Sequence, residues 1–158
     1  MTMEGYMGTH ILGTWPAADS LTTLAARLIT QLRTEPAKYA ALRADELVDW
    51  QPVGAECHDN ADAWVSAHPG DAVRRGWLYQ RTDPLPEGLM HVFVAHSVVL
   101  TSDDELTDVT LGSLEPTGRF LQHPDDVGGF FGMLLNPVAS PKEFKVLEAW
   151  PNVETSGR

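Results

Sequence analysis

The chain has 158 residues and a single cysteine, so no disulfide can form within it and a disulfide-stapled fold is excluded. No apolar run is long enough for a membrane-spanning helix, which needs about 18 residues. The start, Met1-Thr2-Met3-Glu4, lacks the basic residues and the apolar core of a secretory signal. These absences predict a cytoplasmic protein with no membrane partner.

Basic residues are also scarce: 11 Lys and Arg stand against 22 Asp and Glu, which makes the formal net charge −11. Binding to a phosphate backbone relies on Lys and Arg, so we expect no nucleic-acid partner. The hydrophobic fraction of 43% and the five tryptophans are typical of a folded globular protein. The length predicts one domain over residues 1–158, with an arm or loop at 1–19 and a loose tail at 154–158. No feature of the sequence indicates the oligomeric state.

The only cysteine, Cys57, lies directly before a helical pattern that stops at Pro69-Gly70. The residues on one face of this pattern recur at i, i+3, i+4 and i+7: Ala61, Trp64, Val65 and His68. We therefore expect Cys57 at the N-terminus of a helix, where unpaired backbone N–H groups and the helix dipole favour an anion. A thiol in that position loses its proton more readily, and the thiolate is the nucleophilic form.

Helical patterns dominate the first third of the chain and strand-like patterns follow the cysteine helix, which together predict an α+β fold with antiparallel strands. An apolar stripe predicts a first helix capped by Asp19 or Ser20. Pro36 suits the first turn of a second helix that reaches Trp50. The predicted strands are 73–81, 91–100, 105–111 and 144–150, and a short helix is predicted from Pro124 through Leu135.

His96 lies in the predicted strand 91–100 and Asp108 in the strand 105–111, with a hairpin turn around 102–104. The two side chains share a face of the sheet only if the loop has an odd number of residues. A three-residue loop would pair Asp108 with Val98, which makes His96 and Asp108 diagonal neighbours. A two-residue turn would place them on opposite faces, so the register decides whether they meet.

Cys57, His96 and Asp108 together supply the parts of a Cys-His-Asp site. The imidazole would take the thiol proton and later return it to a leaving group, because its pKa lies near neutrality. The carboxylate would fix the tautomer and orientation of the imidazole. An oxyanion would be stabilised by the Cys57 backbone N–H and by a side chain, for which Gln51 and Asn60 are the candidates. His58, directly after the cysteine, is expected to point away from the site.

Each of these residues also has a plainer explanation. Cys57 can be an inert buried residue, His96 a hydrogen-bonded core histidine and Asp108 an acceptor for nearby backbone N–H groups. A zinc site is a further alternative, although the paired ligands at short spacing that are typical of structural zinc are missing. Its candidate ligands are Cys57, His58, His96 and Asp108.

Two short segments resemble motifs of the papain-like and transglutaminase-like cysteine superfamily: His96-Ser97-Val98-Val99, and Leu106-Thr107-Asp108-Val109-Thr110. Gln51 precedes Cys57 by six residues, which is similar to the spacing of the oxyanion glutamine in papain-type proteins. The spacing from histidine to acid is closer to that of transglutaminase-like proteins. The resemblance implies a helix that opens at the cysteine and packs on an antiparallel sheet. The wider pattern Cys-His-x-Asn, Gly-Trp, His-Ser-Val-Val and Asp-Val-Thr also resembles an uncharacterised bacterial family.

We therefore expect a small cysteine hydrolase or acyltransferase that acts on an amide bond, of the peptidase, amidase or glutamine deamidase type, without a cofactor. Its substrate would be a peptide, a protein or a small amide. Cys57 would be the nucleophile, His96 the general base and then acid, and Asp108 the orienting group. The alternative is a non-catalytic binding protein that retains the fold. Fast alkylation of Cys57 near neutral pH would separate the two.

Overall fold

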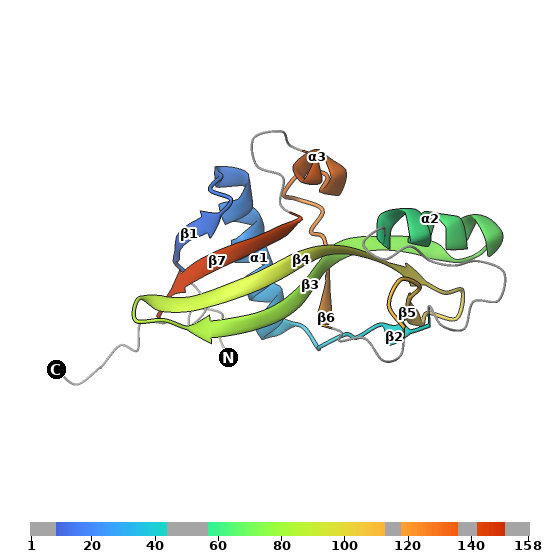
Figure 1. Ribbon diagram of the computed structural model, residues 1–158, viewed down its shortest axis with the longest axis horizontal. Coiled ribbons are helices and arrows are strands. Elements are labelled where there is room, and N and C mark those ends of the chain that lie inside the picture. Colours follow the sequence, from blue (N-terminus) through green and yellow to red (C-terminus); the bar gives the residue numbers. More distant parts are fainter. Residues whose placement is uncertain (1–8, 44–56, 113–117, 136–141, 151–158) are drawn as a thin grey trace. The chain divides into compact units, whose positions relative to one another are not determined.

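The computed structural model describes residues 9–43, 57–112, 118–135 and 142–150, and within them it has the predicted α+β class (Figure 1). The predicted tail at 154–158 and the candidate Gln51 lie outside the described residues. The elements, in chain order, are β1 (Ile11–Trp15), α1 (Asp19–Thr34), β2 (Ala41–Leu42), α2 (Cys57–Ala67), β3 (Ala72–Pro84), β4 (Gly88–Leu100), β5 (Leu106–Asp108), β6 (Arg119–Gln122), α3 (Phe130–Leu134) and β7 (Glu143–Ala149).

The strands form a largely antiparallel sheet in the order β1-β7-β4-β3-β6, and β5 pairs with both β4 and β2. The chain divides into two compact units, and the long hairpin of β3 and β4 contributes residues to both. The first unit comprises residues 1–35, 81–93 and 124–158, and the second comprises residues 36–80 and 94–123. Every residue of the candidate site that the structure describes belongs to the second unit.

In the first unit, α1 buries the face formed by Leu21, Leu24, Ala25, Leu28 and Ile29. The predicted cap at Asp19 or Ser20 is wrong, because the helix begins earlier and its N-cap is Ala18, which makes no side-chain cap hydrogen bond. Asp19 lies in the first turn instead, where its negative charge interacts favourably with the positive end of the helix dipole.

The segment expected to be an arm or loop contains the edge strand β1, which pairs antiparallel with β7. Its strand pattern is hidden in the sequence because the register shifts between Ile11 and Gly13. The predicted strand near the C-terminus is confirmed as β7, and Phe144 of that strand stacks on Phe93 of β4 at 5.3 Å between ring centroids. The predicted short helix exists, but α3 begins at Phe130 rather than near Pro124.

In the second unit, the helix predicted from Pro36 to Trp50 is wrong over its described part, residues 36–43. Ala41 and Leu42 form β2, which pairs in parallel with Thr107 and Asp108 of β5. Pairing with a strand far along the chain here overrides the local helical pattern. The remaining residues of that prediction, 44–50, lie outside the described ones.

The register predicted for a three-residue loop is confirmed in the hairpin of β4 and β5. Val99 pairs with Thr107, and Leu100 pairs with Leu106. The loop 102–104 ends at Asp104, whose φ of 61° is left-handed, as is typical of a three-residue hairpin loop. Aspartate tolerates this conformation better than most residues because its short side chain can hydrogen-bond locally.

Two apolar clusters flank β4 in the second unit. Val98 packs with Ala40, Leu78 and Phe120. Val99 packs with Ala61 of α2 and with Val109, so α2 lies along β4 (Figure 1). Besides β1 and β2, a third strand was not predicted: β6, which has four residues and pairs with β3 on the side away from β4.

Candidate active site

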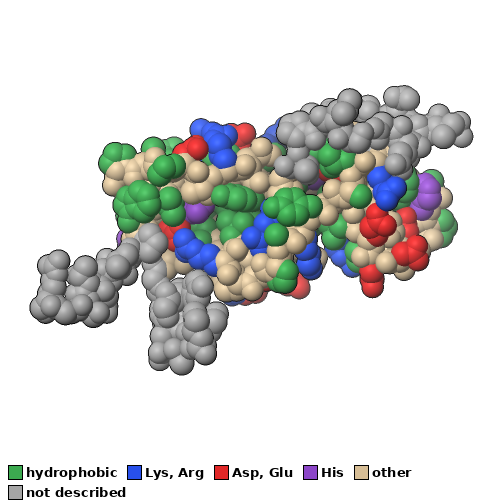
Figure 2. Space-filling view, turned by 90° about the horizontal axis from the view of Figure 1, so that it is seen from below, with side chains coloured by type: hydrophobic (Ala, Val, Ile, Leu, Met, Phe, Trp, Pro, Cys, Tyr) green, Lys and Arg blue, Asp and Glu red, His purple; other side chains and the backbone are tan. Residues whose placement is uncertain are grey.

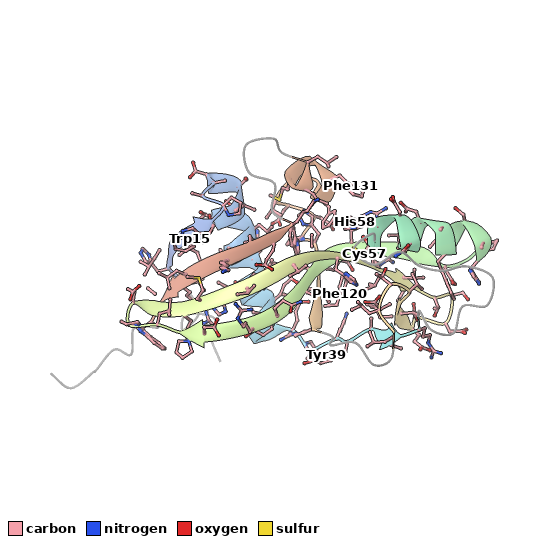
Figure 3. The ribbon with its side chains drawn as sticks, viewed as in Figure 1. Trp15, Tyr39, Cys57, His58, Phe120 and Phe131 are labelled. Atoms are coloured by element: carbon pink, nitrogen blue, oxygen red, sulfur yellow. The ribbon has the colours of Figure 1, made fainter. Side chains whose placement is uncertain are left out.

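Cys57 is the first residue of α2, as the sequence predicts, and Figure 3 shows it at that end of the helix beside His58. The helix is held over the sheet by the predicted apolar face, because Ala61 is buried and Trp64 and Val65 pack against the same cluster as Val99. At the far end of α2, the indole N–H of Trp64 donates to Asp71 Oδ2 at 2.9 Å. These contacts hold the helix along its length and so fix the position of the thiol at its start.

His96 and Asp108 meet as the register predicts. The ring nitrogen Nε2 of His96 and the carboxylate oxygen Oδ2 of Asp108 are 2.6 Å apart. Both side chains are buried, with 6% of His96 and 1% of Asp108 exposed. Because a carboxylate only accepts, Nε2 carries the hydrogen, which leaves Nδ1 as the ring nitrogen available to the Cys57 thiol.

The carboxylate of Asp108 is itself held in place by the backbone that follows it. Its second oxygen, Oδ1, accepts the backbone N–H of Thr110 at 2.8 Å and that of Leu111 at 2.9 Å. Asp108 therefore serves both the chain turn after β5 and the orientation of the His96 ring. Asp108 thus has both the contact with His96 and the plainer role considered from the sequence, as an acceptor for backbone N–H groups.

The ionisation of Cys57 and His96 is shifted by their polar neighbours, chiefly His58 for the thiol and Asp108 for the imidazole. Burial alone raises the pKa of the Cys57 thiol, but hydrogen bonds from His58 and His96 and the charges of both rings outweigh burial and lower that pKa from 9.0 to about 6. Burial alone lowers the pKa of His96, but hydrogen bonds to Asp108 and Cys57 and their negative charges raise it from 6.5 to about 9. Between these two values the pair is a thiolate beside an imidazolium.

The expectation that His58 points away from the site is wrong. Its ring nitrogens Nδ1 and Nε2 lie 3.7 Å and 3.9 Å from Cys57 Sγ. Nδ1 is also 2.5 Å from the hydroxyl oxygen of Ser97, a completely buried residue of β4. The thiol is therefore flanked by two histidines rather than one.

Ser97 is held in turn by Arg75 of β3, whose Nη1 donates to the serine hydroxyl oxygen at 2.9 Å. The other terminal nitrogen of Arg75 pairs with Asp62 Oδ1 at 2.8 Å. Asp62 lies four residues after His58, so the two project from one side of α2 towards the same pair of strands. A chain of polar contacts thus links this side of α2 to β3 and β4.

Asn60, one of the two predicted side-chain oxyanion donors, is buried, and its side-chain amide donates to Thr110 Oγ1 at 3.1 Å. That bond ties α2 to the turn that holds Asp108. The other candidate, Gln51, lies outside the described residues. Within the described part of the chain, the remaining candidate oxyanion donors are therefore the first-turn backbone N–H groups of α2 and the His58 ring.

The zinc alternative finds no support in the side-chain geometry. Across the described ranges, no three His, Cys, Asp or Glu side chains converge in the way that a bound metal ion requires. Among Cys57, His58, His96 and Asp108, the close contacts are the pairwise ones given above, and Asp108 Oδ1 is occupied by two backbone N–H groups.

The sequence analysis missed Ser97 and Arg75 and misjudged His58. One signal for Ser97 was available, because it is the only hydroxyl residue in a strand otherwise rich in Val and Phe. A signal for His58 was its i, i+4 spacing from Asp62, since residues at that spacing lie on one side of a helix and can face the same strands. Nothing local pointed to Arg75, which meets Ser97 only through the pairing of β3 with β4.

Comparison of the chain with models of known protein families, with curated proteins and with solved structures found no match. The functional argument therefore depends on the geometry of the site. None of the described helices has the length and the apolar character needed to cross a membrane.

Proposed function

We propose that this chain is a cysteine-dependent hydrolase or acyltransferase that acts on an amide bond. The observation that carries the proposal is the geometry at the start of α2, where His58 lies 3.7 Å from Cys57 Sγ and His96 lies 2.6 Å from Asp108. In this setting the pKa of the thiol falls to about 6 and that of the His96 imidazole rises to about 9. A protein that only needed to bury a cysteine would gain nothing from ionising it. Strongly shifted pKa values in a buried pair of this kind are typical of catalytic sites.

The first half of the reaction forms a thioester. The Cys57 thiolate attacks the carbonyl carbon of the amide, a C–S bond forms, and the C=O electron pair moves onto the oxygen. When the oxyanion collapses, the C–N bond breaks, and the departing nitrogen takes the proton from the His96 imidazolium. The amine or ammonia leaves, and the enzyme holds an acyl group on sulfur beside a neutral imidazole.

The second half of the reaction releases the acyl group. Neutral His96 takes a proton from water, or from an acceptor amine or alcohol, as that group attacks the thioester carbon. The new oxyanion collapses, the C–S bond breaks, and Cys57 departs as the thiolate that began the cycle. Asp108 keeps Nε2–H of His96 in place throughout and stabilises the imidazolium, without taking the proton itself.

The resemblance of the His96 and Asp108 segments to the transglutaminase-like and papain-like superfamily supports the same chemistry. A peptide, a protein or a small amide such as a glutamine side chain is the substrate class we propose. The formal charge of −11 and the mixture of basic with acidic and apolar side chains on the face in Figure 2 support a substrate other than nucleic acid.

The test is acylation of Cys57 by an activated ester such as p-nitrophenyl acetate. We expect a burst of one equivalent of p-nitrophenol and an acetyl thioester on Cys57, found by mass spectrometry of the intact protein. Cys57→Ala should abolish the burst. His68→Ala, which changes an exposed histidine at the far end of α2, should leave it intact. Ammonia release from glutamine-containing peptides would then distinguish a deamidase from a peptidase.

A non-catalytic binding protein is the second candidate, and the observation that favours it is the fold role of Asp108, which accepts two backbone N–H groups. In such a protein the carboxylate serves the turn after β5, and the contact with His96 is a by-product of the register. A wild-type protein that forms no acyl thioester, and whose Cys57 alkylates only near the ordinary thiol pKa, would favour this candidate.

A further inference from the structure

We propose that His58 is a second catalytic histidine, which donates a hydrogen bond from Nε2–H to the oxyanion formed on the substrate. This inference rests on the proposed function, because it assigns a role within the same reaction. His58 lies beside the thiol, and the group that holds its ring, Ser97, differs from the one that holds His96, which is Asp108. The two histidines therefore have different tasks: His96 moves the proton and His58 stabilises charge.

The first step of the argument is that Nδ1 of His58 is occupied by Ser97. The two atoms are 2.5 Å apart, which is a short hydrogen bond. An imidazole nitrogen has one in-plane bonding direction, and the contact with Ser97 uses it. Nδ1 is therefore not the atom that exchanges a proton with the thiol, even though it lies 3.7 Å from Sγ.

The second step assigns the hydrogen in that bond. Arg75 is a donor only, and its Nη1 already donates to the Ser97 oxygen, so the hydroxyl hydrogen cannot point towards Arg75. Ser97 is completely buried and has no access to solvent. Its other hydrogen-bond partner is Nδ1 of His58, so we assign the Ser97 hydroxyl as the donor in this bond. In its neutral form, a His58 ring that accepts at Nδ1 carries its hydrogen on Nε2.

The third step concerns the position of Nε2. It lies 3.9 Å from Cys57 Sγ. In the tetrahedral intermediate, the oxyanion is attached to the carbon that is bonded to sulfur, and an effective donor lies about 3 Å from that oxygen. A nitrogen 3.9 Å from the sulfur is within reach of this point. Cys57 is buried whereas His58 is partly exposed, so a substrate that approaches from solvent meets the His58 ring beside the thiol.

The fourth step is that the other predicted side-chain donor is engaged elsewhere. Asn60 donates to Thr110 and supports the Asp108 turn. His58 is the side chain beside the thiol with a donor fixed by a buried network, in which Ser97 and Arg75 act as positioning residues. The second oxyanion donor would be a backbone N–H of the first turn of α2, where N–H groups lack intrahelical acceptors.

The experiment compares two reactions of the same thiolate. Acetylation by p-nitrophenyl acetate passes through an oxyanion, whereas alkylation by iodoacetamide displaces iodide at a saturated carbon and forms none. Both rates are measured against pH, so that each can be expressed per thiolate. We expect His58→Ala to lower the acetylation rate per thiolate about 100-fold. We expect it to leave the alkylation rate per thiolate unchanged, and His68→Ala should change neither.

Two further variants and one spectrum keep the outcome clear. His58→Gln, which retains a side-chain N–H donor, should recover part of the acetylation rate. Ser97→Ala should also lower acetylation, because the His58 tautomer is no longer fixed. The loss should be smaller than in His58→Ala, because the ring itself remains. Nitrogen-15 NMR of the wild-type protein should place the His58 hydrogen on Nε2, with a bond partner on Nδ1. This last measurement needs no variant to fold.

Equal losses of acetylation and alkylation per thiolate in His58→Ala would overturn the proposal, since His58 would then act on the thiol alone. A neutral ring with its hydrogen only on Nδ1 would overturn it as well. Both results leave the proposed function standing, provided that the wild-type protein forms the acetyl thioester. If the wild-type protein forms none, the proposed function itself fails.

Discussion

Nε2 of His96 lies 2.6 Å from Oδ2 of Asp108, although twelve residues separate the two along the chain. The contact exists because β4 and β5 pair in a register that makes the two side chains diagonal neighbours on one face. The same carboxylate is fixed on its other side by two backbone N–H groups. A rigid acceptor of this kind determines which nitrogen of His96 faces the thiol.

The first prediction concerns the rate at which iodoacetamide alkylates Cys57 as a function of pH. The thiol pKa is lowered to about 6, so the rate should rise as pH increases through about 6 and level off above it. His96→Ala removes a hydrogen bond and a positive charge, and should move the inflection towards the ordinary value of 9.0. An unchanged inflection in His96→Ala would contradict the ion pair. Because Cys57 is buried, the position of the inflection is the informative quantity, rather than the absolute rate.

The second prediction concerns the pH dependence of acyl transfer from an amide substrate. The thiolate is present above about pH 6, and the imidazolium that protonates the leaving group is present below about pH 9. The rate at low substrate concentration should therefore rise through about 6 and fall through about 9. With an activated ester, whose leaving group needs no proton, the rate should still rise through about pH 6 but should no longer fall at alkaline pH. If both substrates show the same alkaline limb, that limb does not report the proton of His96.

The third prediction concerns Asp108→Asn and Asp108→Ala. In Asp108→Asn, the side-chain oxygen can keep the N–H groups of Thr110 and Leu111, but the amide N–H₂ then faces Nε2–H of His96. The ring should shift to the tautomer with its hydrogen on Nδ1. Turnover should fall by up to about 10⁴-fold, and the inflection in thiol alkylation should rise.

Asp108→Ala should show the same loss of turnover with an added loss of stability. It removes the acceptor for two backbone N–H groups, each of which costs about 1–3 kcal/mol when left buried and unpaired. Thermal melts of both variants, run beside alkylation rates, separate the two roles of the carboxylate. A destabilised Asp108→Asn protein whose thiol reacts as in the wild type would refute the orienting role.

The fourth prediction concerns a buried ion pair in the first unit. Glu148 of β7 is 2% exposed, and its carboxylate accepts two hydrogen bonds from Arg33 of α1, at 2.5 Å and 2.7 Å. Its Oε1 also lies 2.9 Å from Nε2 of His91. Glu148→Gln removes the charge and keeps the shape, and should lower the free energy of unfolding by about 1.5–3 kcal/mol near neutral pH, the range for hydrogen bonds to a charged group. Glu143→Gln changes an exposed residue of the same strand and is the matched control.

The pH dependence of that difference has a definite sign. Burial alone raises the pKa of Glu148, but hydrogen bonds from His91 and Arg33 and their charges lower it below 4.5 in the folded protein. The stabilisation should be fully present above pH 4.5 and should be lost as pH falls through the lowered folded-state pKa. Urea denaturation of the wild type and Glu148→Gln between pH 7 and pH 3 measures the difference. A difference that grows as pH falls would contradict the assignment.

Local patterns in the sequence were enough to predict the cysteine helix and the hairpin strands that carry His96 and Asp108. The apolar positions of α2 and the stop at Pro69-Gly70 are local signals. They predicted a helix that follows Cys57 and ends before Pro69, and α2 begins at Cys57. The turn residues at 102–104 were compatible with a three-residue loop or a two-residue turn, and the structure has the three-residue loop, with Asp104 in the left-handed conformation. The sequence therefore placed His96 and Asp108 on adjacent strands, and the register of β4 and β5 decided that they share one face of the sheet.

Tertiary structure alone decided what surrounds the thiol. The segment at 41–42 became a strand because its backbone pairs with β5, a partner more than sixty residues later. His58 faces the thiol because Ser97 of β4 and Arg75 of β3 hold its ring and the neighbouring Asp62, and these contacts join three separate elements. The sequence determined that its only cysteine stands at the start of a helix, through short-range backbone preferences. Which groups surround the Cys57 thiol depends on contacts between distant residues, and no local pattern encodes those contacts.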